Sequence, residues 1–147
     1  MIGTNTDALT DLFREAIVGI VPTITYKGAE GWKPYGREAA GPSTTRRFRI
    51  GWSAGSFFSP GIFTDGVVET LCECRIRTDY AGNADEMQHA IIEDYHQLCE
   101  TLAALKSPSN GLMLVERDGV IFRDGDPDND VVQVDHTFQV RYLRART

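Results

Sequence analysis

Along the last stretch of the chain, Val131–Leu143, mainly apolar residues alternate with polar residues without a break. This pattern predicts a strand with one buried face. Fully extended, it would be about 43 Å long, whereas a compact domain of this size has a radius of gyration of about 15 Å. We therefore expect one end to bend, or to reach past its own domain toward a neighbouring molecule. The positions expected to face inward are Val132, Val134, His136, Phe138, Val140 and Tyr142.

Two other segments place apolar residues at helical spacing. In the first, Thr6 can cap the helix, Leu9 begins its apolar face and Pro22 stops it. The second runs from Asn83 to Lys106, with a capping arrangement at its start and an apolar stripe along one side. The sequence therefore predicts two amphipathic helices that pack on the rest of the domain.

Strand patterns fill much of the remaining chain. Arg46–Ile50 and Val67–Arg77 both alternate between inward and outward positions. Two shorter apolar runs, Leu112–Val115 and Val120–Phe122, flank Asp118-Gly119, a pair typical of tight hairpin turns. Strand pairs joined by tight turns indicate a mainly antiparallel sheet. The prediction is an α+β fold, a two-layer single domain in which two helices pack on that sheet.

The chain length fits one domain, residues 1–147, that buries about two-thirds of its unfolded surface. Two long loops are expected at 27–45 and 51–66, where glycines alternate with aromatic residues. Aromatic side chains dispersed among glycines cannot all enter the core of a small domain, and such residues are favoured at protein interfaces. We therefore expect some of them to dock on another chain.

Composition narrows the classes of function. With 41% hydrophobic and 24% charged residues, the chain is typical of a soluble globular protein. A net charge of −6 argues against general nucleic-acid binding, which needs a concentrated positive face. No apolar run approaches the roughly 20 residues that span a bilayer, and the first residues lack a secretory pattern. Three cysteines, an odd number, do not suggest a disulfide framework, so a reducing cytoplasm fits best.

Arginines gather at two places in the sequence. One group is formed by Arg46, Arg47 and Arg49, and the other by residues 141, 144 and 146. Each group could be a local contact patch. The interpretation we favour is a charged strand edge that keeps the sheet soluble.

The expected outer face of the second helix carries the clearest candidate for chemistry. His89, Glu93, His96 and Glu100 follow one another at spacings of four, three and four, so they share one surface. Glu93 and His96 match the Glu-x-x-His arrangement of di-iron bundles, which also require ligands from at least one more helix. The other predicted helix has no histidine, and these residues point away from the apolar stripe. A solvated face is therefore the preferred interpretation.

Three further groups of residues partly match known kinds of site. Asp124, Asp126 and Asp128 repeat as in a calcium loop, but the following residues depart from the calcium-binding pattern, which favours an acidic turn. Cys72, Cys74 and Cys99 with His96 would make a strained zinc set, so buried thiols are favoured. Gly51-x-Ser53-x-Gly55 has the letters of a nucleophile elbow without the helix that must follow it. For His136 we expect a hydrogen-bonded histidine in the core.

The order of these elements resembles the tail terminator proteins of long-tailed bacteriophages, a class of minor tail protein. The resemblance rests on the capped first helix, the Gly- and aromatic-rich middle, Val67–Arg77, the helix from Asn83 to Lys106 and the arginine-ended strand from Val131 to Tyr142. It implies a virion structural protein whose copies form a hexameric ring. The ring would cap the tail tube, stop its polymerisation and provide the surface for head–tail joining.

The resemblance also implies the partners: further copies of this chain, the tail tube protein and the head–tail connector protein, but neither a membrane nor specific nucleic acid. No catalysis and no cofactor are expected, and the place of action is the virion, after assembly in the host cytoplasm. Exposure arguments suggest two sets of interface residues, one on each side of the subunit. These are Trp52, Phe57 and Phe58, and Arg141, Tyr142 and Arg144.

Two alternatives stay open at this point. Another head–tail neck or connector subunit would have the same size and association habit. A small metal-binding or hydrolytic domain would instead use His89, Glu93 and His96, or the acidic segment 124–130.

Overall fold

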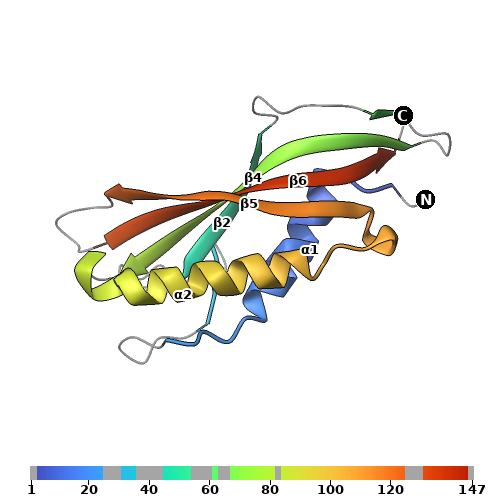
Figure 1. The fold of residues 1–147 in the computed structure, drawn as a ribbon. Helices are drawn as coiled ribbons and strands as arrows, with labels where there is room; N and C mark the ends of the chain where they lie inside the picture. Colours follow the sequence, from blue (N-terminus) through green and yellow to red (C-terminus); the bar gives the residue numbers. More distant parts are fainter. Residues whose placement is uncertain are drawn as a thin grey trace.

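The computed structural model of this chain describes residues 3–24, 31–35, 45–53, 61–62, 67–81, 84–124 and 131–145. Two helices pack on a six-stranded sheet in which all pairs of strands but one are antiparallel, which confirms the predicted α+β class (Figure 1). The strand order is β1-β2-β4-β6-β5, and β3 also pairs with β4. The elements are α1 (Thr6–Val18), β1 (Lys33–Pro34), β2 (Arg47–Ser53), β3 (Gly61–Ile62), β4 (Val67–Ala81), α2 (Ala84–Ala103), the 3₁₀ turn η1 (Pro108–Asn110), β5 (Leu112–Asp124) and β6 (Val131–Ala145).

The two longest strands, β4 and β6, lie side by side at the centre of the sheet. They are paired without interruption from Val67 opposite Ala145 to Ala81 opposite Val131. Burial alternates along β4 as predicted, and β4 continues four residues beyond the predicted end at Arg77. In β6 the prediction of a single buried face is wrong, because Asp135 and Thr137, which lie between the inward residues, are buried as well. Both strands extend past the end of α2 (Figure 1). Their buried residues under the helices are Thr70, Cys72, Cys74, Ile76, Thr78, Tyr80, Val134, His136, Phe138, Val140 and Tyr142.

The predicted hairpin at Asp118-Gly119 is wrong. Leu112–Asp124 is one strand that pairs with β6 along its length, and the register shifts between Arg117 and Gly119. This shift is a β-bulge, in which one strand carries an extra residue. Gly119 adopts a φ of 157°, which a residue with a side chain rarely adopts, and its carbonyl oxygen accepts a hydrogen bond from the Thr137 hydroxyl at 3.1 Å. The glycine that suggested a turn therefore serves a bulge in a continuous strand.

Each helix covers the sheet with the predicted apolar side. The cap of α1 is Asn5 rather than Thr6, because the Asn5 side-chain oxygen accepts a hydrogen bond from the Ala8 amide at 2.8 Å. The start of α2 at Asn83 lies outside the described residues. Neither helix has a stretch that is long and apolar enough to cross a bilayer. The helical residues in the core are Leu9, Phe13, Ile17, Met87, Ala90, Ile91, Leu98 and Leu102.

A fully buried ion pair joins the start of β2 to α2. The Arg46 guanidinium donates from Nε to Asp94 at 2.7 Å and from Nη2 to the second carboxylate oxygen at 3.2 Å. Nη2 also donates to the Ile24 carbonyl at 2.6 Å, and the Tyr80 hydroxyl donates to Asp94 at 2.8 Å. Burial raises the pKa of the Asp94 carboxyl, while these donors oppose the rise by stabilising the carboxylate. The pair thus holds α2 on the sheet through two buried charges, each of which is stabilised by the other.

Removing one partner of this pair should destabilise the fold strongly. Asp94→Ala leaves the Arg46 charge buried without its carboxylate, and we expect the free energy of unfolding to fall by about 3–5 kcal/mol. Urea unfolding followed by circular dichroism measures this. The matched control is Asp11→Ala, which breaks the exposed Arg14–Asp11 pair and should change stability by less than about 1 kcal/mol. Equal effects of the two substitutions would contradict the assignment.

Candidate functional site

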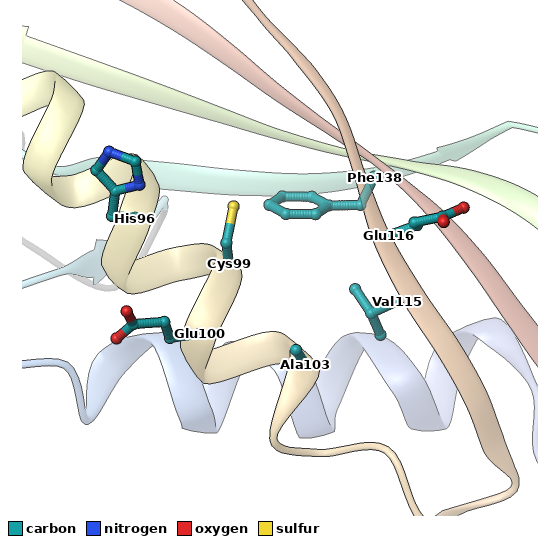
Figure 2. Close-up of a pocket in the computed structure, with 7 residues that line it drawn as sticks. All are labelled: His96, Cys99, Glu100, Ala103, Val115, Glu116 and Phe138. Atoms are coloured by element: carbon teal, nitrogen blue, oxygen red, sulfur yellow. The ribbon is translucent and has the colours of Figure 1, made fainter.

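A groove lies between α2 and the edge strand β5. Its volume is about 450 Å³. In Figure 2, Cys99 of α2 and Phe138 of β6 point toward each other, and Val115 of β5 points into the same space. Glu100 and Glu116 point away from it on opposite sides. The groove therefore has an apolar floor and charged rims. Its lining is His96, Cys99, Glu100, Ala103, Val115, Glu116 and Phe138.

The strand that borders this groove, β5, lies at one edge of the sheet. One edge of β5 pairs with β6, and its other edge makes a single bridge, between Leu112 and Ser107. Elsewhere along β5, no described residue pairs with that edge. Met113 at its start is 40% exposed. An open strand edge presents unpaired N–H and C=O groups and is a template for pairing with another chain.

The structure keeps the proposed metal ligands of α2 on the solvent side. His89, His96 and Glu100 are exposed and Glu93 is half-buried, as the sequence pattern predicted. Among the described residues, no three His, Cys, Asp or Glu side chains gather closely enough to hold a metal ion. The weaker calcium candidates Asp126 and Asp128, and the side chain of Asp124, lie outside the described part of the structure, so the preferred acidic turn stays a prediction.

The cysteines and the serine take separate places. Cys72 and Cys74 are buried under the helices, Cys99 lines the groove, and none of the three forms a disulfide. Burial raises the pKa of the Cys74 thiol, so it stays protonated at neutral pH. Ser53 is exposed at the end of β2, whereas His136 is buried under α2. The structure therefore does not bring Ser53 and His136 together.

The six predicted interface residues differ in their burial and in whether the structure describes them. Trp52 is half-buried against α1, where its Nε1 donates to the Thr10 hydroxyl at 2.7 Å and its ring lies 5.7 Å from that of Phe13. Phe57 and Phe58 lie outside the described residues. The remaining three belong to the end of β6.

At the end of β6, Arg141 and Arg144 are exposed and Tyr142 is not. Arg141 is paired with Glu69 at 2.9 Å across the strand pair. Tyr142 is only 4% exposed, and its hydroxyl lies 3.7 Å from the Cys72 sulfur. Burial raises the pKa of Tyr142 to about 12. The burial of Tyr142 contradicts the exposure from which its interface role was argued. Alternation along β6 turns Tyr142 toward the helices and Arg141 away from them, while Arg144, two residues further on, is exposed near the end of the strand.

His136 was expected to be a hydrogen-bonded core residue, and only the burial is as expected. Neither ring nitrogen has a hydrogen-bond partner among the described residues. The imidazole instead stacks on the Tyr95 ring, with centroids 5.6 Å apart and planes 10° from parallel. Burial lowers the pKa of His136 to about 3, because a charged imidazolium would lose its hydration there. His136 is thus a neutral packing residue in the native protein.

The groove itself was missed by the sequence analysis. Its walls come from α2 and β5, and its floor includes Phe138 of β6, so no local pattern marks it. The expectation of a hairpin also concealed the long edge strand. The only sequence signal was the apolar stripe of α2, whose side residue Cys99 widens it toward β5.

No protein-family model matches the sequence, and no curated protein matches it.

His136 should make the protein less stable in mild acid. The unfolded chain takes up a proton near pH 6.5, whereas the native imidazole resists protonation until about pH 3, so stability falls as the pH drops through this window. Between pH 7.5 and pH 5, this residue alone should lower the free energy of unfolding by about 2 kcal/mol. Urea unfolding of the protein and of His136→Leu at both pH values measures the difference.

The control for this experiment is His89→Gln. Its imidazole is exposed on α2, so its replacement should leave the pH dependence close to that of the original chain. If His136→Leu lost as much stability between the two pH values as the original chain does, a neutral buried imidazole would be ruled out.

Proposed function

We propose that this chain is a virion structural protein, a tail terminator whose copies form a ring on the end of the tail tube of a long-tailed bacteriophage. The observation that carries the proposal is the open edge of β5 beside the apolar groove. In this proposal the partner at that edge is a segment of a second copy. Ring assembly uses heterologous contacts, in which one surface meets a different surface of the next copy.

Physical reasons support self-association at this edge. An added strand would satisfy the outward N–H and C=O groups of β5, and alternate side chains of that strand would enter the groove. Cys99, Val115 and Phe138 offer an apolar contact whose burial stabilises association. Glu100 and Glu116 at the rims would disfavour acidic partners and select the register of docking.

The specific role rests on the resemblance and its implied partners. The two helices, the long strand β4 and the arginine-ended strand β6 occur in the order on which the resemblance was based. The proposed ring would contact the tail tube protein on one side and the head–tail connector protein on the other. Arg141 and Arg144, exposed at the end of β6, are candidates for one of these contacts. No cofactor and no bond-making chemistry form part of the proposal.

A charge placed in the groove should weaken self-association. Ala103 is exposed, ends α2 and lines the groove, so Ala103→Lys adds a long cation there without disturbing the core. Sedimentation velocity over a concentration series, with added tail tube where the free protein is monomeric, should show association weakened at least about tenfold. Ala104→Lys is the matched control, since Ala104 is exposed next to it but does not line the groove. Identical behaviour of the two variants would remove the groove from the interface.

The tail terminator role has its own test. Electron microscopy of particles from a phage lacking this gene should show overlong or headless tails, restored to normal by the original chain and not by Ala103→Lys. Normal tails of the usual length in the deletion would exclude the role while leaving self-association open.

A further inference from the structure

A second hollow lies on the sheet face opposite the helices. It has a volume of about 180 Å³ and is lined by Arg49, Ile50, Gly51, Arg75 and Arg77. Gly51 lies opposite Arg75 in the pairing of β2 with β4, and a Cβ added there would meet nothing nearer than the Arg75 carbonyl oxygen at 4.0 Å. The missing side chain therefore leaves the space that the three arginines border.

The charges around this hollow do not balance. Arg75 pairs with Glu73 at 3.2 Å, and Arg77 pairs with Asp135 through two contacts of 2.9 and 3.3 Å. Arg49 makes no salt bridge with any described residue, and its guanidinium lies 5.1 Å from the centre of the Tyr35 ring. The Nε of Arg75 is buried without a hydrogen-bond partner in the described part of the chain. Three guanidinium groups thus face two carboxylates, which leaves a positive site on a chain of net charge −6.

The same chain carries a segment of opposite charge. Residues 124–130 have aspartate at four of seven positions and no basic residue. The segment connects the end of β5 to the start of β6, at the end of the sheet where Ala81 is paired with Val131. Carboxylates and guanidinium groups form strong charge-assisted hydrogen bonds, so the two features are chemically complementary.

Chain length limits how far the segment of the same chain could extend toward the hollow. Arg75 lies six residues from Ala81 along β4, a distance of about 20 Å in a strand. The six residues between Asp124 and Val131 must leave the sheet end and return to it, so their reach is at most about 12 Å. The hollow also lies between β2 and β4, two strands away from β6. Backbone length alone does not carry the segment of the same chain as far as Arg75, which favours the segment of another copy as the occupant.

We propose that this arginine hollow binds the acidic segment 124–130 of a neighbouring copy, so that subunits join head to tail. The inference rests on the proposed self-association. The hollow borders β2, whereas Asp124, the first residue of the segment, ends β5 at the other edge of the sheet, as a heterologous contact requires. The contact also neutralises carboxylates that would otherwise repel the same segment on other copies.

Peptide binding tests the hollow without requiring a ring. A fluorescein-labelled peptide of residues 124–131 should bind the full-length protein at low salt, and binding should weaken as salt rises from 50 to about 200 mM. Arg49→Glu combined with Arg75→Glu should weaken binding at least about tenfold through like-charge repulsion. Gly51→Val, which fills the hollow without a backbone clash, should do the same and does not change the charge.

Controls separate this site from general charge effects. A peptide with all four aspartates replaced by asparagine should not bind. Arg14→Glu removes a cation from α1, away from the hollow, and should leave peptide binding within about twofold. No binding at millimolar peptide, or equal binding by the original chain, the Gly51→Val chain and the double variant, would overturn the assignment of the hollow.

A charge exchange then tests the contact between copies. The Arg49→Glu, Arg75→Glu chain and an Asp126→Lys, Asp128→Lys chain should each associate at least about tenfold more weakly than the original in sedimentation velocity. Their mixture should recover association, because each supplies the complement of the other. Recovery in the mixture supports the head-to-tail contact. Failure of the mixture, with Ala103→Lys still effective, would reject the hollow as an interface and leave the ring proposal standing.

Discussion

The uninterrupted antiparallel pairing of β4 with β6 is the constraint on which the rest of the structure depends. It fixes fifteen residues of each strand in a single register. Because side chains alternate, a slip of one residue would exchange the helix-covered face with the opposite face along the whole ladder. Ile76 opposite His136 belongs to the covered face, and Arg77 opposite Asp135 to the other. The two-contact ion pair between Arg77 and Asp135 stabilises only the observed register.

The buried Arg46–Asp94 pair plays the corresponding role for α2. Apolar packing against the sheet is non-directional, so Leu98 and Leu102 could be buried at more than one helix position. A carboxylate that must receive hydrogen bonds from both Arg46 and Tyr80 allows far fewer positions. The position of α2 in turn sets the width of the groove toward β5. By positioning α2, the buried polar network therefore also determines the shape of the groove, which is the candidate assembly surface.

The sequence predicted the features that arise from local periodicity. Both long strands, both helices and the α+β class follow from alternation or helical spacing, and the structure contains them. The errors came from tertiary context. Asp118-Gly119 fits a turn and a bulge equally well, and only pairing of both halves of β5 with β6 decides between them. Arg46 was grouped with solvent-exposed arginines, because its carboxylate partner lies 48 residues away on α2.

The candidate sites show the same division. Exposure of the histidines on α2 was predictable from helix geometry. The groove and the arginine hollow were not, because the groove combines residues of α2, β5 and β6 and the hollow combines residues of β2 and β4, which are distant in sequence. Tyr142 shows how closely composition and geometry must be read together. Its neighbours Arg141 and Arg144 made the segment look like a contact surface, although alternation already assigned the tyrosine to the core.

The arrangement of these surfaces bears on how copies could assemble. An open β5 edge alone permits two copies to pair symmetrically and stop at a dimer, since a strand edge can meet its own copy. The arginine hollow and the acidic segment differ in charge, and Asp124 at the start of the segment ends β5, at the sheet edge away from the hollow. In the proposed contact, a pair of copies therefore keeps one unused hollow and one unused segment. Such a pair can always accept another copy. Growth then ends only when the rotation between neighbours closes a ring, and a closed ring is the form that capping a tube requires.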